Sequence, residues 1–223
     1  MENVFNSFYQ DYDAWYQTQM GAFVHKVETD ALWSLLEPQP GMKILDASCG
    51  TGNQSLELAA HGCKVTGIDI APNMLDQATK KLCARGLAAE FQLMDCTKME
   101  FANASFDAAI SVAAFEFIPN PQAALREMRR VVKPGGVVVI GTIVRGGEWA
   151  NLYSSQVCKG TAYEHAKFLS LDDLRQLDPS GFECFVECLF IPPGQPEEAY
   201  TESREKSLAV TGKKGGFVCA RYK

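Results

Sequence analysis

The chain has 223 residues, a length that suits one domain with additions better than two complete domains. Hydrophobic residues make up 47% and charged residues 22%, which are ordinary values for a globular protein and exclude a disordered chain or a coiled coil. The net charge is −6, so we expect no nucleic-acid partner. The absence of a long apolar stretch and of a targeting segment predicts a cytoplasmic protein with no membrane span and with reduced cysteines.

The first predicted elements alternate between helix and strand. Apolar residues at helical spacing predict a lead-in helix over 22–36, which ends before Pro38. The apolar run 42–47 lies between glycines and predicts a buried parallel strand. A helix over 53–61, closed by Gly62, follows it.

The same alternation continues through the middle of the chain. It predicts strands at 63–69, 90–94, 105–112 and 137–144. Pro72 opens one intervening helix, and Asn120 and Pro121 cap and open another, which ends at the Lys-Pro-Gly-Gly stretch before the last of these strands. Five strands that alternate with helices predict a doubly wound parallel sheet.

The last third of the chain has a different pattern. We expect irregular structure over 145–170, a short helix over 171–177, and strands over 182–191 and 216–223. The polar, proline-broken segment between those strands favours an antiparallel pair. The fold class is therefore α/β, a Rossmann-like, doubly wound, mostly parallel seven-stranded sheet that ends in an antiparallel hairpin. Two cysteines on one side of the first of those strands are expected in the core or on the sheet face, Cys184 and Cys188.

A glycine-rich turn follows the first strand, and an acid ends the second. The turn contains Ser48, Gly50 and Gly52, and Asp69 follows Gly50 by about 20 residues. Glycines let the backbone approach a ligand closely, and a carboxylate on the neighbouring strand can accept hydrogen bonds from both hydroxyls of a ribose. The sequence contains neither the dinucleotide fingerprint nor the phosphate loop, which favours a ribose without a phosphate.

These segments carry a family resemblance. The stretches ILDASCGTGNQ, GIDIAPNMLDQA, MDCTKMEFANASFDAAISV and ALREMRRVVKPGG resemble the class I S-adenosylmethionine-dependent methyltransferases. The branch most similar to the chain acts on small molecules and includes the ubiquinone and menaquinone biosynthesis methyltransferases. The resemblance implies S-adenosylmethionine as cofactor, S-adenosylhomocysteine as its product, and a small-molecule methyl acceptor as substrate.

The resemblance also implies which residues hold the cofactor. It assigns the methionine part to the first turn, the ribose to the acid after the second strand, the adenine to residues after the second and third strands, and the floor under the sulfonium to the end of the fourth. In chain order these residues are Asp46, Ala47, Ser48, Gly50, Gly52, Asp69, Ile70, Met74, Asp95, Cys96, Ser111 and Val112. Ser48 replaces the first glycine of the family's motif, at a cost if that position needs a positive φ.

Catalytic groups are less clearly indicated. The methyl group is already activated on the sulfonium, so in-line positioning and exclusion of water carry most of the reaction. Glu116 and His165 are the candidates for a general base, although a surface carboxylate and a surface histidine are equally ordinary explanations. Many relatives have histidine where this chain has Phe117. Cys49, Cys96 and Cys158 have no spacing that supports a metal or metalloid site, and we expect no metal.

The predicted acceptor side is aromatic. Tyr9, Tyr12, Trp15 and Tyr16 cluster before the lead-in helix, as a flap over the site or as a packed segment, and Phe115 follows the fourth strand. We expect a single methyltransferase domain with a helical cap at 1–40, a cofactor core at 41–144 and a substrate-side insertion with the final strands at 145–223. A non-catalytic nucleoside-binding module and, less favoured, an NAD(P)-dependent oxidoreductase are the alternatives, and the chain is expected to be a monomer or a homodimer.

Overall fold

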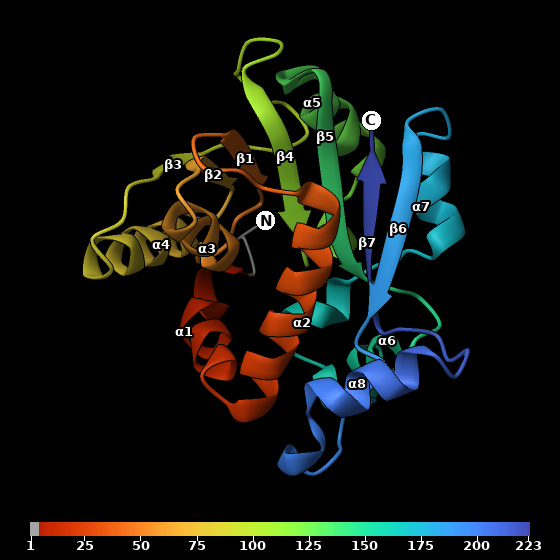
Figure 1. Cartoon of the computed structure of the whole chain (residues 1–223). Coiled ribbons are helices and arrows are strands. Elements are labelled where there is room, and N and C mark those ends of the chain that lie inside the picture. The colour runs from red at the N-terminus through yellow and green to blue at the C-terminus, as the bar shows by residue number, and fades with distance from the viewer. Residues whose placement is uncertain (1–4) are drawn as a thin grey trace.

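The structure is a computed structural model that describes the backbone of residues 5–223 and the side chains of Phe5 and residues 12–223. The described chain forms one seven-stranded sheet with the order β3-β2-β1-β4-β5-β7-β6 (Figure 1). The strands are β1 (Lys43–Ala47), β2 (Lys64–Asp69), β3 (Glu90–Leu93), β4 (Phe106–Val112), β5 (Val132–Ile143), β6 (Phe182–Cys188) and β7 (Phe217–Tyr222). The pairs among β1 to β5 are parallel, and β7 runs antiparallel to β5 and β6. The predicted fold class is confirmed.

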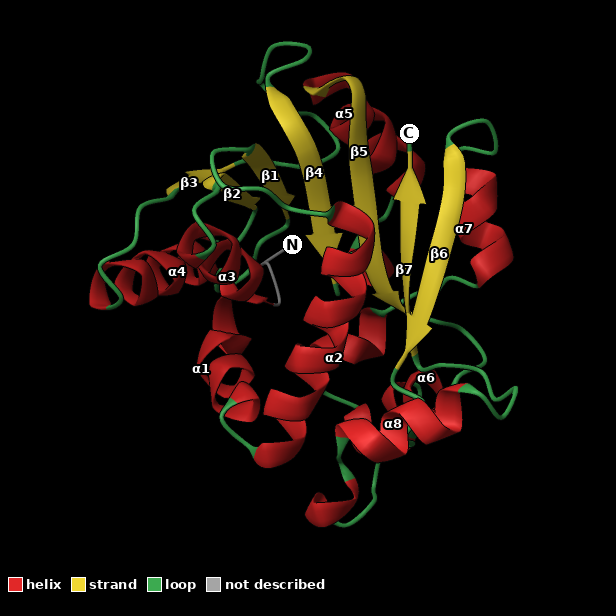
Figure 2. Cartoon of the chain, in the orientation of Figure 1, coloured by secondary structure: helices red, strands yellow, loops and turns green. Residues whose placement is uncertain are grey.

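Helices cover both faces of the sheet (Figure 2). One face packs against α2 (Gln19–Leu36) and α3 (Asn53–Ala60), and the other against α5 (Pro121–Val131) and α7 (Leu171–Leu177). Within β5, Val137 and Val139 point to the α2 face, whereas Val138 and Ile140 point to the α5 face. Because both faces are buried, the central strands are continuously apolar, as a parallel sheet requires.

The predicted helix starts are confirmed by their caps. The Asn120 side chain accepts a hydrogen bond from the Ala123 amide at 3.1 Å, and Pro121 occupies the first turn of α5. Pro72 likewise opens α4 (Pro72–Ala84), which packs against β2 and β3. Each helix therefore begins at a residue whose chemistry suits that position.

Several segments depart from the expectations. Strand β5 begins at Val132, because Val132 already pairs with Phe106 before the Lys-Pro-Gly-Gly excursion. The segment expected to be irregular contains α6 (Glu148–Tyr153) and two 3-10 turns, η2 (Gln156–Cys158) and η3 (Ala162–His165). Helix α6 is held by Trp149, which is buried and donates its indole N–H to the Ile191 carbonyl at 2.9 Å. Of the two cysteines of β6 expected in the core or on the sheet face, Cys188 is buried and Cys184 is exposed, because the edge strand leaves that position uncovered.

Two further helices complete the chain. Helix α1 (Phe5–Tyr16) precedes α2, and α8 (Glu202–Ala209) lies between β6 and β7. The buried Glu205 of α8 accepts hydrogen bonds from the Phe190 and Ile191 amides at 2.9 and 3.0 Å, which fastens this helix to the end of β6. None of the helices described is both long and apolar enough to cross a bilayer.

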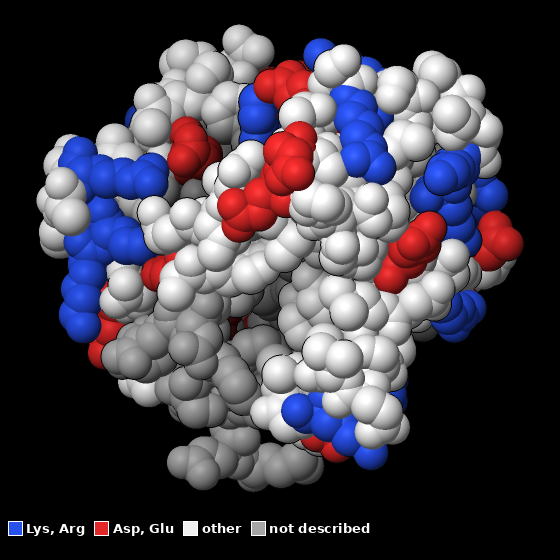
Figure 3. Space-filling model, turned by 90° about the horizontal axis from the view of Figure 1, so that it is seen from below, with Lys and Arg blue, Asp and Glu red and all other residues white. Residues whose placement is uncertain are grey.

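The strand order reverses between β1 and β4. Strand β1 pairs with β2 on one side and with β4 on the other, so the connections leave in opposite directions and open a crevice at the carboxyl ends of these strands. Viewed onto this end, the molecule is hollowed near its centre, where most of the surface is uncharged, and basic side chains lie toward the edges of the view (Figure 3). Ligands of open α/β sheets bind at this position.

Candidate active site

The turn after β1 is built from positive-φ backbone. Ser48, Gly50 and Gly52 have φ of 62°, 53° and 77°. A left-handed conformation costs a non-glycine residue roughly 1–2 kcal/mol, so the cost expected at Ser48 is present. A Cβ on Gly52 would lie 2.9 Å from the Ala78 Cβ, so glycine at this position also lets α3 and α4 approach. The turn therefore exposes its backbone to the crevice and closes tightly against α4.

Asp69 ties this turn to the second strand. Its Oδ2 accepts a hydrogen bond from the Gly50 amide and its Oδ1 accepts one from the Ala71 amide, both at 2.8 Å. Burial raises the pKa of Asp69, and the backbone amides oppose that rise. Each carboxylate oxygen keeps a further lone pair, so Asp69 can still accept hydrogen bonds from a ligand.

A first cavity of about 350 Å³ opens beside this turn. The turn supplies one wall, and residues after β3 and β4 supply others. Eight of the twelve residues predicted to hold the cofactor line it: Ser48, Gly50, Asp69, Ile70, Met74, Asp95, Cys96 and Val112. The described lining contains two carboxylates and no Lys, Arg or His.

The other four predicted residues lie behind the wall. Asp46 is buried, accepts a hydrogen bond from the Ser55 hydroxyl at 2.6 Å and lines only a small pocket of about 20 Å³. Ala47 and Ser111 are buried, and Gly52 has the packing role described above. These residues support the wall from behind.

A second cavity of about 340 Å³ adjoins the first. The two share Phe5, Tyr12, Met74, Ala113 and Phe117, so they meet at the ends of α1 and β4. Its walls are mostly aromatic, and α1, α2, η1 (Phe115–Phe117), α6 and η3 contribute to them. Elements from all parts of the chain therefore close this second space.

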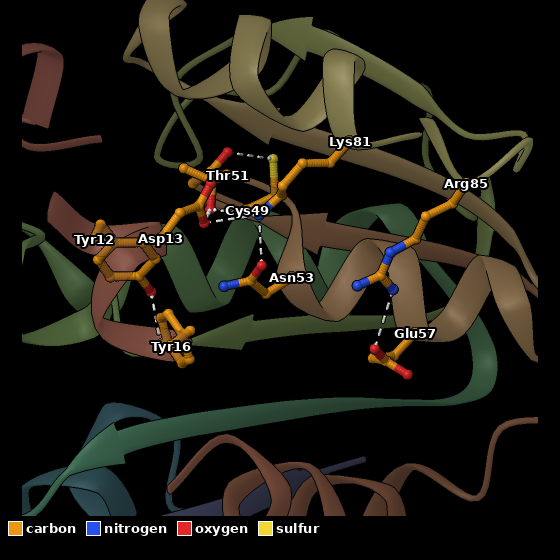
Figure 4. Close-up of polar contacts among 10 residues, drawn as sticks. Tyr12, Asp13, Tyr16, Cys49, Thr51, Asn53, Glu57, Lys81 and Arg85 are labelled. Carbon is orange, nitrogen blue, oxygen red and sulfur yellow. Dashed lines mark hydrogen bonds and ion pairs between the residues drawn. The ribbon is translucent and has the colours of Figure 1, made fainter. Parts of the chain in front are cut away.

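Helix α1 is clamped onto the glycine-rich turn (Figure 4). Lys81 of α4 donates hydrogen bonds to Asp13 Oδ1, Thr51 Oγ1 and Asn53 Oδ1 at 2.8, 3.0 and 2.6 Å. The Thr51 hydroxyl donates to the same Asp13 oxygen at 2.7 Å. Burial lowers the pKa of Lys81, and Asp13 opposes that shift. We call these four residues the α1 clamp.

Two buried glutamates lie at the second cavity. Glu28 of α2 lines it and is 6% exposed; Glu116 lies behind the wall, is 1% exposed and accepts a hydrogen bond from the Thr142 hydroxyl at 2.7 Å. Burial, together with Glu116, raises the pKa of Glu28 to about 8. Burial raises the pKa of Glu116 to about 7. Within the described chain neither glutamate has a basic partner.

Only some of the aromatic residues predicted for the acceptor side line the second cavity. Tyr12, Trp15 and Tyr16 line the second cavity, whereas the side chain of Tyr9 lies outside the described residues. Phe115 does not line the second cavity, because the η1 turn directs its side chain into the core on the α5 face. Its place is taken by Phe117, which lines both cavities.

The two candidate bases lie in different surroundings. Glu116 is buried rather than on the surface. His165 is exposed at the end of η3, and the described linings of both cavities exclude it. The structure therefore does not bring the two candidates together.

Sequence reasoning missed Glu28, although a signal was present. Glu28 lies four residues after Val24 and four before Leu32, so an acid occupies the apolar stripe of the lead-in helix. Trp149, Tyr153 and Tyr163 were also missed, since they lie in the segment expected to be irregular. The sequence of that segment has no periodic apolar pattern from which its packing against the site could be predicted.

The fold and the glycine turn are those that the resemblance to class I methyltransferases predicts, and comparisons with known proteins agree with it. Residues 45–140 match the family model Methyltransf_11, a methyltransferase domain. A Thermotoga maritima structure described as a SAM-dependent methyltransferase, possible histamine N-methyltransferase, is 25% identical, covers 100% of this chain and 99% of that one, and has a TM-score of 0.76. Residues 45–140 therefore carry a methyltransferase domain, and the whole chain is similar in fold to an S-adenosylmethionine-dependent methyltransferase.

Curated relatives match mainly the core. Demethylmenaquinone methyltransferase of Desulfitobacterium hafniense is 34% identical over 62% of this chain and 56% of that protein. The 2-methyl-6-phytyl-1,4-hydroquinone methyltransferase of Synechocystis is 38% identical over 53% of this chain and 36% of that protein. A sterol 4-C-methyltransferase of Caenorhabditis elegans is 32% identical over 51% and 35%. The chain thus matches between about a third and three fifths of the length of these relatives.

Proposed function

We propose that this protein transfers a methyl group from S-adenosylmethionine to a small organic acceptor held in the second cavity. The observation that carries this proposal is the pair of adjoining cavities, about 350 and 340 Å³, which meet at Met74, Ala113 and Phe117. A cofactor in the first cavity and an acceptor in the second would then face each other across this boundary. A nucleoside-binding module without activity would have no use for the second space.

The first cavity fits the cofactor. The Gly50 backbone and the Asp69 carboxylate would hold the methionine part and the ribose, and apolar Ile70 and Met74 would flank the adenine. Asp95 is exposed in the cavity, and its Oδ1 already accepts hydrogen bonds from Thr97, which leaves Oδ2 for a ligand amino group. The acidic lining suits a cationic sulfonium.

The protein contributes by positioning the acceptor and by excluding water from it. When bound, S-adenosylmethionine supplies a methyl group on a positively charged sulfur, which keeps the bonding electrons when the methyl leaves. The aromatic walls of the second cavity exclude water from the acceptor, and the shared boundary sets the line of approach. Proximity and desolvation of this kind lower the activation barrier by several kcal/mol, and by roughly 7–11 kcal/mol in well-oriented cases.

According to their names, the three curated relatives methylate a sterol, a phytyl hydroquinone and demethylmenaquinone. The second cavity of this protein is lined mainly by aromatic and aliphatic side chains, which supports a small acceptor with an apolar body. We propose that residues 1–40 and 145–223 select that acceptor, within a single domain built around the core at 41–144.

A pair of cysteine variants tests the proposal. Cys158 lines the second cavity only, so Cys158→Trp fills the acceptor space and should abolish transfer of labelled methyl groups while S-adenosylhomocysteine still binds in calorimetry. Cys83 is exposed on α4, and Cys83→Trp is the matched control with unchanged activity. Full activity in Cys158→Trp would contradict the assignment of the second cavity to the acceptor.

We further propose a cytoplasmic location and a monomeric or homodimeric state. Each of the eight cysteines is free in the described chain, which supports a reducing compartment. Cell fractionation and light scattering on purified protein test the two statements separately. Neither is needed for the methyl-transfer proposal.

A further inference from the structure

The second cavity combines aromatic walls with an acid that has no counter-charge. Its aromatic lining is Phe5, Tyr12, Trp15, Tyr16, Phe117, Trp149, Tyr153 and Tyr163. The rings of Tyr153 and Tyr163 stack with centroids 3.9 Å apart, and the hydroxyls of Tyr12 and Tyr16 lie 3.1 Å apart. Glu28 lines the same space, is 6% exposed, and takes part in none of the ion pairs of the described structure.

The charge around Glu28 is negative or neutral on every side. The described lining of the second cavity contains no Lys, Arg or His. Glu116 of η1 acts on Glu28, and Glu28 in turn raises the pKa of Tyr12 and Tyr16 of α1, Tyr153 of α6, Tyr163 of η3, Cys188 of β6 and Cys219 of β7. His25 of α2 lines the small pocket beside Glu28, and burial lowers the pKa of this histidine. A buried carboxylate without a cation is costly, so burial raises the pKa of Glu28, and its ionised form becomes favourable only when a cation lies beside it.

We infer that the acceptor is a primary or secondary amine, which enters as an ammonium ion and transfers a proton to Glu28 before it is methylated. This inference rests on the proposed function. An ammonium ion supplies the missing counter-charge, and the faces of Tyr and Trp rings attract cations. A phenolate, thiolate or carboxylate in the same place would be repelled by both glutamates.

The proton transfer needs no reactant besides the amine and Glu28. The bound ammonium ion stabilises the ionised carboxylate, so Glu28 first releases the proton that it holds to solvent. One N–H bond of the ammonium then breaks, an O–H bond forms on the Glu28 carboxylate, and the electron pair stays on nitrogen as the lone pair that attacks the methyl carbon. Glu28 also lines the small pocket that contains Ser48 and Asp46, which joins the acceptor side to the glycine turn. Glu28 then returns the proton to solvent when the product leaves. Burial brings the pKa of Glu28 near neutrality, where a general base is most useful.

The first test is binding. Wild-type protein saturated with S-adenosylhomocysteine is titrated with 2-phenylethylamine, 2-phenylethanol and 3-phenylpropionate, and tryptophan fluorescence reports occupancy because Trp15 and Trp149 line the cavity. We expect the amine to bind at least 10-fold more tightly than the alcohol or the acid, and Glu28→Gln to remove that preference. Equal binding of the three compounds, or an unchanged preference in Glu28→Gln, would overturn the inference.

The second test is turnover with labelled methyl groups on a panel of amines, phenols, thiols and carbon acids. We expect label on amines, a loss of 100-fold or more in kcat/KM for Glu28→Gln, loss of the pH limb that Glu28 produces, and partial recovery in Glu28→Asp. Exposed Glu148 on α6 provides the control Glu148→Gln, which should match wild type. Label on phenols, thiols or carbon acids but not on amines overturns the amine assignment and leaves the proposed function standing. No label on any acceptor overturns the proposed function itself.

Discussion

Asp69 has two roles at one position. It holds the glycine turn through the Gly50 amide and the start of α4 through the Ala71 amide, and in the proposed complex its remaining lone pairs accept the ribose hydroxyls. The turn that it holds includes the strained Ser48, whose φ of 62° needs support from its neighbours. Loss of the charge should therefore disturb both the ligand contacts and the backbone that forms the cavity wall.

We expect Asp69→Asn to weaken S-adenosylhomocysteine binding by roughly 1–3 kcal/mol, because charge-assisted hydrogen bonds are lost and an amide group faces two backbone donors. Calorimetric titration measures the change. Asp76 is exposed on α4, and Asp76→Asn is the matched control for the loss of one negative charge. Wild-type affinity in Asp69→Asn would remove Asp69 from the cofactor site.

At the scale of elements, α1 is the piece that closes the site. It supplies walls to both cavities, and the α1 clamp joins it to the glycine turn and to α4 (Figure 4). The Asp13 and Lys81 side chains are only 18% and 21% exposed, so their ion pair is less screened than a surface pair. Opening of α1 would expose both cavities at once.

Asp13→Ala should loosen α1. Removal of hydrogen bonds to a charged group typically costs about 1.5–3 kcal/mol, so amide exchange in residues 5–16 should rise by roughly 10-fold or more while the sheet stays protected. Hydrogen-exchange mass spectrometry measures this change. Arg85 lies on the same helix as Lys81, and its 3.4 Å contact with Glu57 joins two exposed side chains, so Arg85→Ala is the control with little expected effect. Equal amide exchange in the two variants would show that the α1 clamp does not hold α1 in place.

At the scale of the whole molecule, three buried acids gather around the site. Burial raises the pKa of Asp46 and Glu116 to about 7 and that of Glu28 to about 8. At a pH between the unfolded pKa, near 4, and the folded pKa, each of these groups is protonated in the folded protein and ionised in the unfolded chain. Stability from these groups is therefore complete below the unfolded pKa, near 4, and is lost as the pH rises through the folded pKa.

Glu116→Gln tests this linkage, because glutamine resembles the protonated acid in shape. Between pH 5 and pH 7 the free energy of unfolding of wild type should fall relative to that of the variant by up to about 1.4 kcal/mol per pH unit. Urea unfolding at several pH values measures the difference. The comparison between the two proteins cancels other titrating groups, such as His25, whose lowered pKa acts in the opposite direction. Parallel stability curves would mean that Glu116 is not protonated in the folded protein.

Much of the fold could be predicted because its determinants are local. Apolar runs bounded by glycine, Pro72 and Pro121 at helix starts, and the Asn120 cap all act within a few residues, and the structure shows each of them in place. The boundaries that differ, such as the start of β5 at Val132, depend on pairing with a distant strand. The short helix α6 likewise depends on the distant contact of Trp149 with Ile191.

The sequence by itself determined the doubly wound sheet and the glycine turn with its partner acid, because a turn and the strand beside it are held at one edge by the strand order. Only the tertiary structure decided the second cavity. Tyr12, Glu28, Phe117 and Tyr163 come from four separate elements, and periodicity shows that a side chain is buried without showing what it is buried against. The buried acid without a basic partner at Glu28, from which the amine acceptor is inferred, exists only once those elements pack together.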